Sequence, residues 1–514
     1  MKNLLYFFLT LFVFSKLEAQ GVLPVQRYYN RNIPTYTWDN TSGNAQIDNG
    51  SGTWNTTNLT WVQTPPAGTN LAWKQSYNAI FGGNLGVSAA GTVTVSGTQS
   101  VQSFTFNPTP SGNFTITGGV LNLLGGLVQV NQNASISSSL QGGGNFLKRG
   151  NAILTLTGNN TFTGNMTISQ GGLWLGSSTA AGSTAIILGD VQTGNNNIEW
   201  KWRGSFTPNN ALMVTNNGAG TVTIGTYSSG TNTNHNGTIN LNRSVVFYDG
   251  TTDRTSFSGK ISGNASLITI DGIGTWNAST GSGARITFDN NTNDFIGNIV
   301  VLTGKALQFN GVTVVNNQPI EVNGNLVLNV GAGNAGKMGT LTGASTGICE
   351  IHYLVASNQT LSVGNDNGSG TFNGVIRNGI GGKVMNLRKE GIGVQALTGA
   401  HTYTGSTNAN LGTLVFTQMP TSAIFNATVS NTAPSSSTNS GSITMPNAPN
   451  LTGKIFNIVL TESGTGISYF PITWQGTAAG TPTLQVNGAA RTSGVAANGT
   501  TVTYLPGSGI RVTR

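Results

Sequence analysis

Apolar and polar residues alternate with period two in short segments along most of this chain. Residues 91–97 are a clear example, because Val93 and Val95 fall on one face and Thr92 and Thr94 on the other. Gly and Asn separate such segments, and both residues accept the positive φ that tight turns require. The pattern predicts an all-β chain built from many short strands.

A larger unit recurs about three times. In each copy a Leu or Ile two positions from a Gly is followed by an aromatic-Xaa-Gly turn and then by another strand. The copies are marked by Leu140, Ile261 and Ile376, which lie 121 and 115 residues apart. Repetition at such spacing is typical of a solenoid, in which each unit buries its apolar face mainly on its neighbours.

Composition agrees with this architecture and limits the function classes. The chain has 514 residues, of which 73 are Gly and only 7% are charged, far below the quarter usual in globular domains. The formal charge of +8 is spread thinly and forms no concentrated basic stripe, so we expect no nucleic-acid partner. The one cysteine, Cys349, excludes an intrachain disulfide and a cysteine-based zinc site.

The N-terminal residues predict export. Lys2 precedes a short apolar core and a cleavage region, as in a signal peptide. No later stretch reaches 18 apolar residues, so we expect no transmembrane segment after signal removal and a secreted or cell-surface protein, with peripheral outer-membrane association as an option. The predicted regions are residues 1–20, the signal peptide; 21–78, a Trp-rich N-terminal cap; 79–429, the β-helix; 430–450, a linker; and 451–514, a C-terminal β cap or sandwich.

The Trp-rich region allows two interpretations. Four of the nine tryptophans lie in it, at positions 38, 54, 61 and 73. A cap is favoured, because a stacked β structure must hide its first rung and block edge pairing. The alternative is an exposed carbohydrate platform, on which indole rings would stack against sugars.

Two segments resemble a known family. Residues 147–173 read LKRGNAILTLTGNNTFTGNMTISQGGL, and residues 387–414 repeat the pattern with the turn Tyr403-Thr404-Gly405. Both are similar to the autotransporter-associated β-strand repeat. The resemblance implies a right-handed parallel β-helix passenger at the surface of a Gram-negative-type bacterium, commonly associated with adhesion, and transfers no catalytic residue. A self-transporting member would also be expected to end in a membrane barrel, a pattern not seen before Arg514.

Few acidic groups could carry chemistry. Asp249 with Asp253 and Arg254 is one grouping, and the segment 289–294, with an Asp at each end, is another. The second is expected to be a turn in which Asx side chains bind backbone, with calcium binding as the alternative.

Glu350 and His352 share a strand face and could ligate a metal or act as acid and base. The favoured interpretation is a polar outward face opposite Cys349 and Ile351, because no third partner is identifiable. The sequence predicts no catalytic residue, no metal site and no cofactor.

The candidate ligand-binding residues are Trp200 and Trp202, in the segment Glu199-Trp200-Lys201-Trp202-Arg203. The two indoles point the same way on a strand. Facing outward, they would form an aromatic shelf for a sugar; facing inward, they would belong to the core, as apolar side chains usually do.

Together these features predict a non-enzymatic adhesin or structural stalk that contacts extracellular glycan, matrix or other cells through many weak contacts. The alternative is a polysaccharide-degrading β-helix enzyme, either a lyase or a glycoside hydrolase. Carboxylates gathered in one groove would favour the enzyme, and scattered ones would favour the adhesin.

Overall fold

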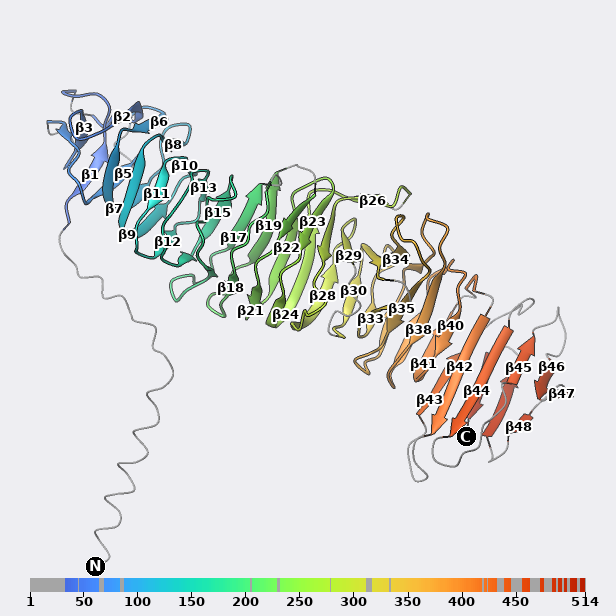
Figure 1. Ribbon diagram of the computed structural model, residues 1–514. Coiled ribbons are helices and arrows are strands. Elements are labelled where there is room, and N and C mark those ends of the chain that lie inside the picture. Colours follow the sequence, from blue (N-terminus) through green and yellow to red (C-terminus); the bar gives the residue numbers. More distant parts are fainter. Residues whose placement is uncertain are drawn as a thin grey trace, which may run out of the picture.

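The computed structural model describes residues 33–422, apart from 45, 64–68, 84–86, 204–205, 229–231, 278, 311–316, 332–333 and 418–419, and beyond these the strands between 424 and 513. The predicted signal peptide lies outside the described residues. The described residues contain strands and turns, and none of them forms a helix that could cross a membrane. The strands stack side by side along one long axis as a parallel β-helix (Figure 1).

Two ladders of hydrogen-bonded strands, called ladders I and II, form the first part of the rod, and most of their pairs are parallel. Ladder I contains β1 (Thr35–Trp38), β3 (Leu59–Val62), β4 (Leu71–Ala72), β5 (Tyr77–Phe81), β7 (Thr98–Phe106), β9 (Val120–Val130), β11 (Ser139–Gln141), β12 (Phe146–Arg149), β14 (Met166–Ile168), β16 (Ile186–Leu188), β18 (Leu212–Val214), β21 (Ile239–Leu241) and the start of β24 (Ile261–Gly272). Ladder II contains β2 (Gly50–Trp54), β6 (Ala90–Val95), β8 (Phe114–Thr117), β10 (Ala134–Ile136), β13 (Ile153–Leu156), β15 (Gly171–Leu175), β17 (Ile198–Arg203), β19 (Val222–Ser228), β22 (Val245–Asp249), the end of β24, β28 (Ile296–Val301), β30 (Ile320–Val322) and β33 (Leu341–Thr342).

Three further ladders continue the rod. Ladder III contains β20 (Thr233–His235), β23 (Arg254–Phe257), β27 (Arg285–Phe288), β29 (Ala306–Asn310), β31 (Asn325–Asn329), β34 (Ile348–Ile351) and β37 (Val375–Ile376). Ladder IV contains β32 (Ala335–Lys337), β35 (Gln359–Val363), β38 (Met385–Lys389), β40 (Thr407–Ala409) and β42 (Ile424–Asn431), and ladder V contains β36 (Gly370–Phe372), β39 (Val394–Leu397), β41 (Gly412–Phe416) and β43 (Asn439–Thr444).

The C-terminal strands change from parallel to antiparallel pairing. β42 pairs in parallel with β44 and antiparallel with β43, and the pairs that follow β44 are antiparallel. Strand β43 lies inside the range predicted as a linker and pairs with β41. Its segment Gly441-Ser442-Ile443-Thr444 has enough strand character to extend the stack. The strands are β44 (Ile455–Glu462), β45 (Ile472–Gln475), β46 (Thr483–Val486), β47 (Ala489–Arg491), β48 (Gly494–Ala496), β49 (Thr500–Leu505) and β50 (Gly509–Thr513).

The N-terminal tryptophans fill the first rungs of the rod. Trp38, Trp54, Trp61 and Trp73 are all at most 2% exposed. The Trp61 ring centroid lies 5.0 Å from that of Trp54 and 4.7 Å from that of Trp73. The exposed carbohydrate platform is therefore wrong for this region, because the indoles cover one another and the following coils.

Parallel stacking places identical register positions above one another. Leu154 of β13 pairs with Leu173 of β15, which pairs with Trp200 of β17. That row continues inside the rod through Ile224 and Phe247, and all five side chains are buried. The outward row is equally continuous, so the exterior presents columns of side chains drawn from successive coils.

The larger repeat rests on a recurring hydrogen bond. In each copy the backbone N–H of the marker residue donates to an Asn or His side chain, and a buried aromatic follows two residues later. The bonds are Leu140 to Asn160 Oδ1 (2.8 Å), Ile261 to Asn293 Oδ1 (2.7 Å) and Ile376 to His401 Nδ1 (3.1 Å), and the aromatics are Phe162, Phe295 and Tyr403. The threefold repetition predicted from the sequence therefore has a structural basis.

Candidate ligand-binding face

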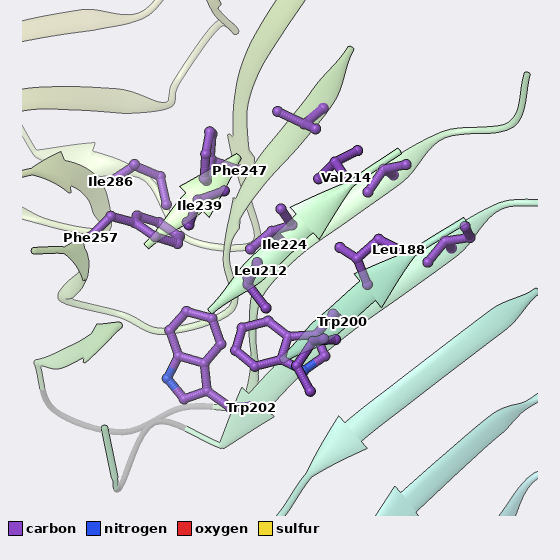
Figure 2. Packing of buried hydrophobic residues seen from close by; sticks show 14 of the residues in the cluster. Leu188, Trp200, Trp202, Leu212, Val214, Ile224, Ile239, Phe247, Phe257 and Ile286 are labelled. Atoms are coloured by element: carbon purple, nitrogen blue, oxygen red, sulfur yellow. The ribbon is translucent and has the colours of Figure 1, made fainter. Parts of the chain in front are cut away.

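The structure places Trp200 and Trp202 inside the rod. Both are fully buried, with ring centroids 5.2 Å apart (Figure 2). The Trp202 indole N–H donates to Thr233 Oγ1 at 2.8 Å. The outward shelf is therefore wrong, because register with Leu173 and Leu175 turns both indoles toward the core.

The same alternation turns other residues of these strands outward. Trp174 lies between the buried Leu173 and Leu175, and it pairs in register with Lys201. The Trp174 ring stacks on that of Tyr227, two coils farther along, with centroids 4.6 Å apart and planes inclined by 17°. Both rings are half-buried, each with one part packed and another open to solvent.

Lys201 links this pair to a third aromatic ring. Its Nζ lies 4.3 Å from the centroid of Tyr248 and 5.7 Å from that of Trp174, within cation–π range of both. The lysine is only 8% exposed, so its ammonium group is largely sheltered by the rings. Trp174, Lys201, Tyr227 and Tyr248 are hereafter called the outer aromatic platform.

Glu199 orients the platform. Its Oε2 accepts the Trp174 indole N–H at 3.1 Å, and its Oε1 lies 3.3 Å from Lys201 Nζ. Burial raises the pKa of Tyr227 and, together with Asp271 and Glu199, that of Tyr248. Both phenols are therefore protonated at neutral pH and keep a hydroxyl that can donate a hydrogen bond.

A pocket of about 410 Å³ adjoins the platform. Gly171 has φ +65°, a left-handed conformation that favours Gly, and a Cβ on Gly172 would lie 3.2 Å from Trp174 Nε1. A Cβ on Gly171 would lie 2.6 Å from the backbone of Asn151, and one on Gly172 would lie 3.0 Å from Ile153 Cγ1, so glycine at these two positions permits the close approach of neighbouring coils. The pocket, hereafter the Asn pocket, is lined by Asn151, Ile153, Gly171, Gly172, Asn195, Asn196, Asn197 and Glu199.

Sequence reasoning missed Trp174, although a signal for it was present. In Gly172-Leu173-Trp174-Leu175 the two leucines fix the inward phase, and the tryptophan between them must then point outward. The segment Trp200-Lys201-Trp202 does not show by itself which of its residues face inward, since tryptophan suits either face of a strand.

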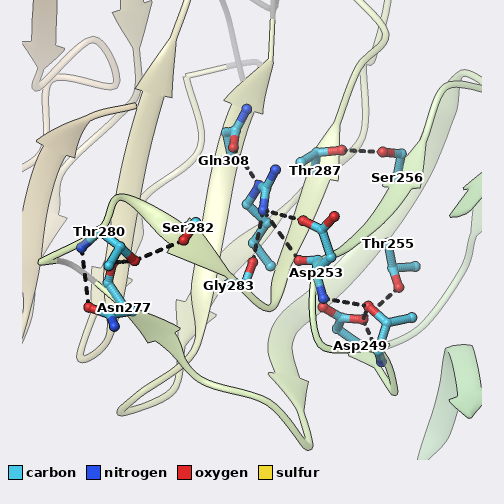
Figure 3. A network of polar contacts seen from close by, with 12 residues as sticks. Asp249, Asp253, Thr255, Ser256, Asn277, Thr280, Ser282, Gly283, Thr287 and Gln308 are labelled. Atoms are coloured by element: carbon cyan, nitrogen blue, oxygen red, sulfur yellow. Dashed lines mark hydrogen bonds and ion pairs between the residues drawn. The ribbon is translucent and has the colours of Figure 1, made fainter. Parts of the chain in front are cut away.

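Asp249 and Asp253 do not form one acidic site. Asp249 is buried, and its Oδ1 accepts hydrogen bonds from the Thr251 and Thr255 hydroxyls, both at 2.7 Å (Figure 3). Burial raises its pKa, which those hydrogen bonds partly oppose. Asp253 instead pairs with Arg285 at 2.9 Å.

The segment 289–294 is a turn held by its own side chains. Asn290 Oδ1 accepts hydrogen bonds from the backbone N–H of Thr292 at 2.8 Å and from its hydroxyl at 2.6 Å. Asp294 pairs with Lys260 at 2.6 Å. Across the described part of the chain, no three His, Cys, Asp or Glu side chains gather in a way that could hold a metal ion.

Glu350 and His352 are covered, contrary to the expected solvent-facing surface. They are only 1% and 4% exposed, beneath the antiparallel hairpin of β25 (Trp276–Asn277) and β26 (Ser282–Gly283). Glu350 Oε1 accepts the Trp276 indole N–H at 2.6 Å, and its Oε2 pairs with Arg377 at 2.6 Å. Burial, together with the charge of Arg285, lowers the pKa of His352 to about 4. This hairpin comes from 74 residues earlier in the chain, so alternation within one strand could not predict the cover.

Comparison with known proteins agrees with the fold. The passenger-associated-transport-repeat family matches residues 146–175 and 387–416. The adhesin BmaC autotransporter of Brucella suis biovar 1 (strain 1330) is 36% identical over 155 residues, which make up 29% of this chain and 4% of that protein. The chain thus spans a small part of the length of this relative, and no solved structure matches it.

The fold and these matches define a passenger-like parallel β-helix. The chain carries two segments that match the passenger-associated-transport repeat.

Proposed function

We propose that this chain is an exported, cell-surface protein of the adhesin type, and that its outer aromatic platform contacts extracellular carbohydrate. The observation that carries the proposal is the outward stack of Trp174 on Tyr227, extended by Lys201 and Tyr248. Half-buried aromatic rings with a polar edge suit ligands that are apolar on one face and hydroxylated at the rim. The similarity to a protein named as an adhesin supports the same class.

The platform is preorganised, which favours binding. The Trp174 ring is held on one side by Tyr227, and its N–H is held by Glu199. A side chain fixed before binding loses less conformational entropy when the ligand arrives. Several weak contacts along a rod would then add through avidity when many copies are displayed on a surface.

The arrangement of acids favours a binding protein over a polysaccharide-degrading enzyme. A glycoside hydrolase normally needs two carboxyl groups facing the same groove. Asp249 and Glu350 are buried and bind protein side chains, and Asp253 pairs with Arg285.

The test is a glycan-array binding assay on the purified chain, with each bound oligosaccharide examined for cleavage by mass spectrometry. We expect binding without cleavage, and a loss of at least about tenfold in affinity in Trp174→Ala, since aromatic anchors carry most of the energy of such contacts. The matched control is Val415→Ala, which truncates the equivalent outward position of the second repeat segment and should leave binding unchanged.

Two results would contradict the proposal. Cleavage products would make the chain an enzyme, and binding that survives Trp174→Ala would move the contact away from the platform. Circular dichroism of each variant separates lost contacts from lost folding.

A further inference from the structure

We infer that the Asn pocket is a subsite for one uncharged pyranose ring of a carbohydrate lying on the platform, and that Glu199 excludes acidic sugars from it. The inference rests on the proposed function and names the ligand class. The volume of the Asn pocket, about 410 Å³, lies within the range of small-molecule sites.

The pocket and the platform form one continuous surface. Glu199 lines the pocket, and the same carboxylate accepts the Trp174 indole N–H at 3.1 Å. Gly172 lines the pocket and lies beside the same indole edge. A saccharide stacked on the platform would therefore place its next ring in the pocket.

The lining has the chemistry of a hydroxyl-binding site. Four of its eight lining residues are asparagines, whose amides both donate and accept hydrogen bonds. Two of them are fixed by the protein: Asn196 Nδ2 donates to Thr193 O at 2.8 Å, and Asn197 Oδ1 accepts the Thr221 N–H at 2.9 Å. Amides held in place in this way suit the ring hydroxyls of a neutral sugar.

Charge decides which sugars can enter. Glu199 is the one charged residue among the lining residues, and its side chain is 33% exposed. Its ion-pair partner Lys201 is only 10% exposed by side chain and is turned toward Tyr248. The pocket therefore presents the carboxylate rather than the ammonium group, and a uronate or sulfated ring would meet like charge.

The second repeat segment carries a larger residue than Gly at the aligned position of the pocket. Without gaps, residues 146–175 align with 387–416, so Thr413 stands where the first segment has Gly172, and Val415 where it has Trp174. Thr413 keeps parallel register with Val394, as Gly172 does with Ile153. The second segment therefore holds Thr at this position beside Val394 and Val415, where the first segment has Ile153 and Trp174.

The experiment compares the full chain with three variants, Gly172→Thr, Glu199→Gln and Trp174→Val. The probes are oligosaccharides of equal length and linkage built from neutral hexose or from the corresponding uronate. We expect the unaltered chain to bind the neutral probe at least about tenfold more tightly than the uronate. Gly172→Thr should weaken neutral binding about tenfold by filling the pocket, while Trp174→Val should abolish binding.

Glu199→Gln tests the role of charge. Glutamine keeps an oxygen that can accept the Trp174 N–H and removes the negative charge. The ratio of the affinity for the neutral probe to that for the uronate probe should therefore fall toward one. A purely structural role for Glu199 would weaken both probes equally and leave their ratio unchanged.

The outcomes separate the two proposals. Loss of binding in Trp174→Val with unchanged binding in Gly172→Thr overturns the subsite and keeps the platform. A preference for uronate, or a ratio unaffected by Glu199→Gln, overturns the exclusion of acidic sugars. No binding of either probe by the unaltered chain overturns both.

Discussion

The two repeat segments, residues 146–175 and 387–416, agree inside the rod and differ on its surface. Both bury a lysine, Lys148 or Lys389, whose ammonium group donates to backbone carbonyl groups at the following turn. Both also bury an aromatic side chain, Phe162 or Tyr403. Outside, the first segment presents a tryptophan where the second presents Val415.

The difference indicates what the repeat specifies. Interior positions must stack on the coils before and after, so their size and hydrogen bonding are restricted. Exterior positions meet solvent and carry no such restriction. A repeat motif of this kind therefore identifies the fold, while the binding properties depend on residues that the motif leaves variable.

Replacing the buried lysines should give the largest effect. Lys148→Met removes the donor to the carbonyl groups of Gly150, Ala152 and Gln170, and we expect a loss of about 3 kcal/mol in local stability. Hydrogen exchange of the neighbouring strand amides measures this locally, as a solenoid need not unfold in one step. Lys389→Met should act in the same way in ladder IV, and protection unchanged in both variants would contradict a structural role for these lysines.

The pH dependence should separate the two lysines. Burial lowers the pKa of Lys148 from 10.5 to about 7, so between pH 7 and 10.5 the unfolded chain binds more protons than the folded one. Local stability of the unaltered chain, relative to Lys148→Met, should therefore rise with pH across this window. Lys389 should show a shallower rise, because Glu390 and Asp366 favour its charged form and partly offset the lowering of its pKa by burial.

The sequence was sufficient for the fold but not for the site. Alternation, turn residues and recurrence at Leu140, Ile261 and Ile376 predict stacked coils because they are local or periodic. The orientation of Trp200 depends on its register with Leu173, a relation between two coils. The cover on Glu350 depends on a hairpin far away in the chain. Predictions failed where a residue's environment is set by another coil.

A second comparison concerns Asn160 and His401, which occupy equivalent positions and accept equivalent backbone hydrogen bonds. Burial lowers the pKa of His401 from 6.5 to about 4, so the unfolded chain binds more protons between these values. Stability near His401 should fall as the pH is lowered through this window, by about 2.5 kcal/mol at pH 4.5. His401→Asn should remove that loss, as measured by the difference in hydrogen-exchange protection from the unaltered chain. An equal loss in the variant would assign the acid sensitivity to other groups.

The smallest predicted effect concerns a hydroxyl that only the second segment has. Tyr403 and Thr407 share a buried hydrogen bond of 2.6 Å, whereas the first segment has Phe162 and Met166 at these positions. Tyr403→Phe should cost about 1 kcal/mol, since it leaves the Thr407 hydroxyl without that partner. Adding Thr407→Met reproduces the pair of the first segment and should recover part of the loss, because both polar groups are then removed together. If the double variant is destabilised by the sum of its single variants, the two residues are not coupled and the segments differ here only by chance. A coupling energy different from zero in this double-mutant cycle would show that the two positions interact, so that the polar pair of the second segment and the apolar pair of the first are each stable only as a pair.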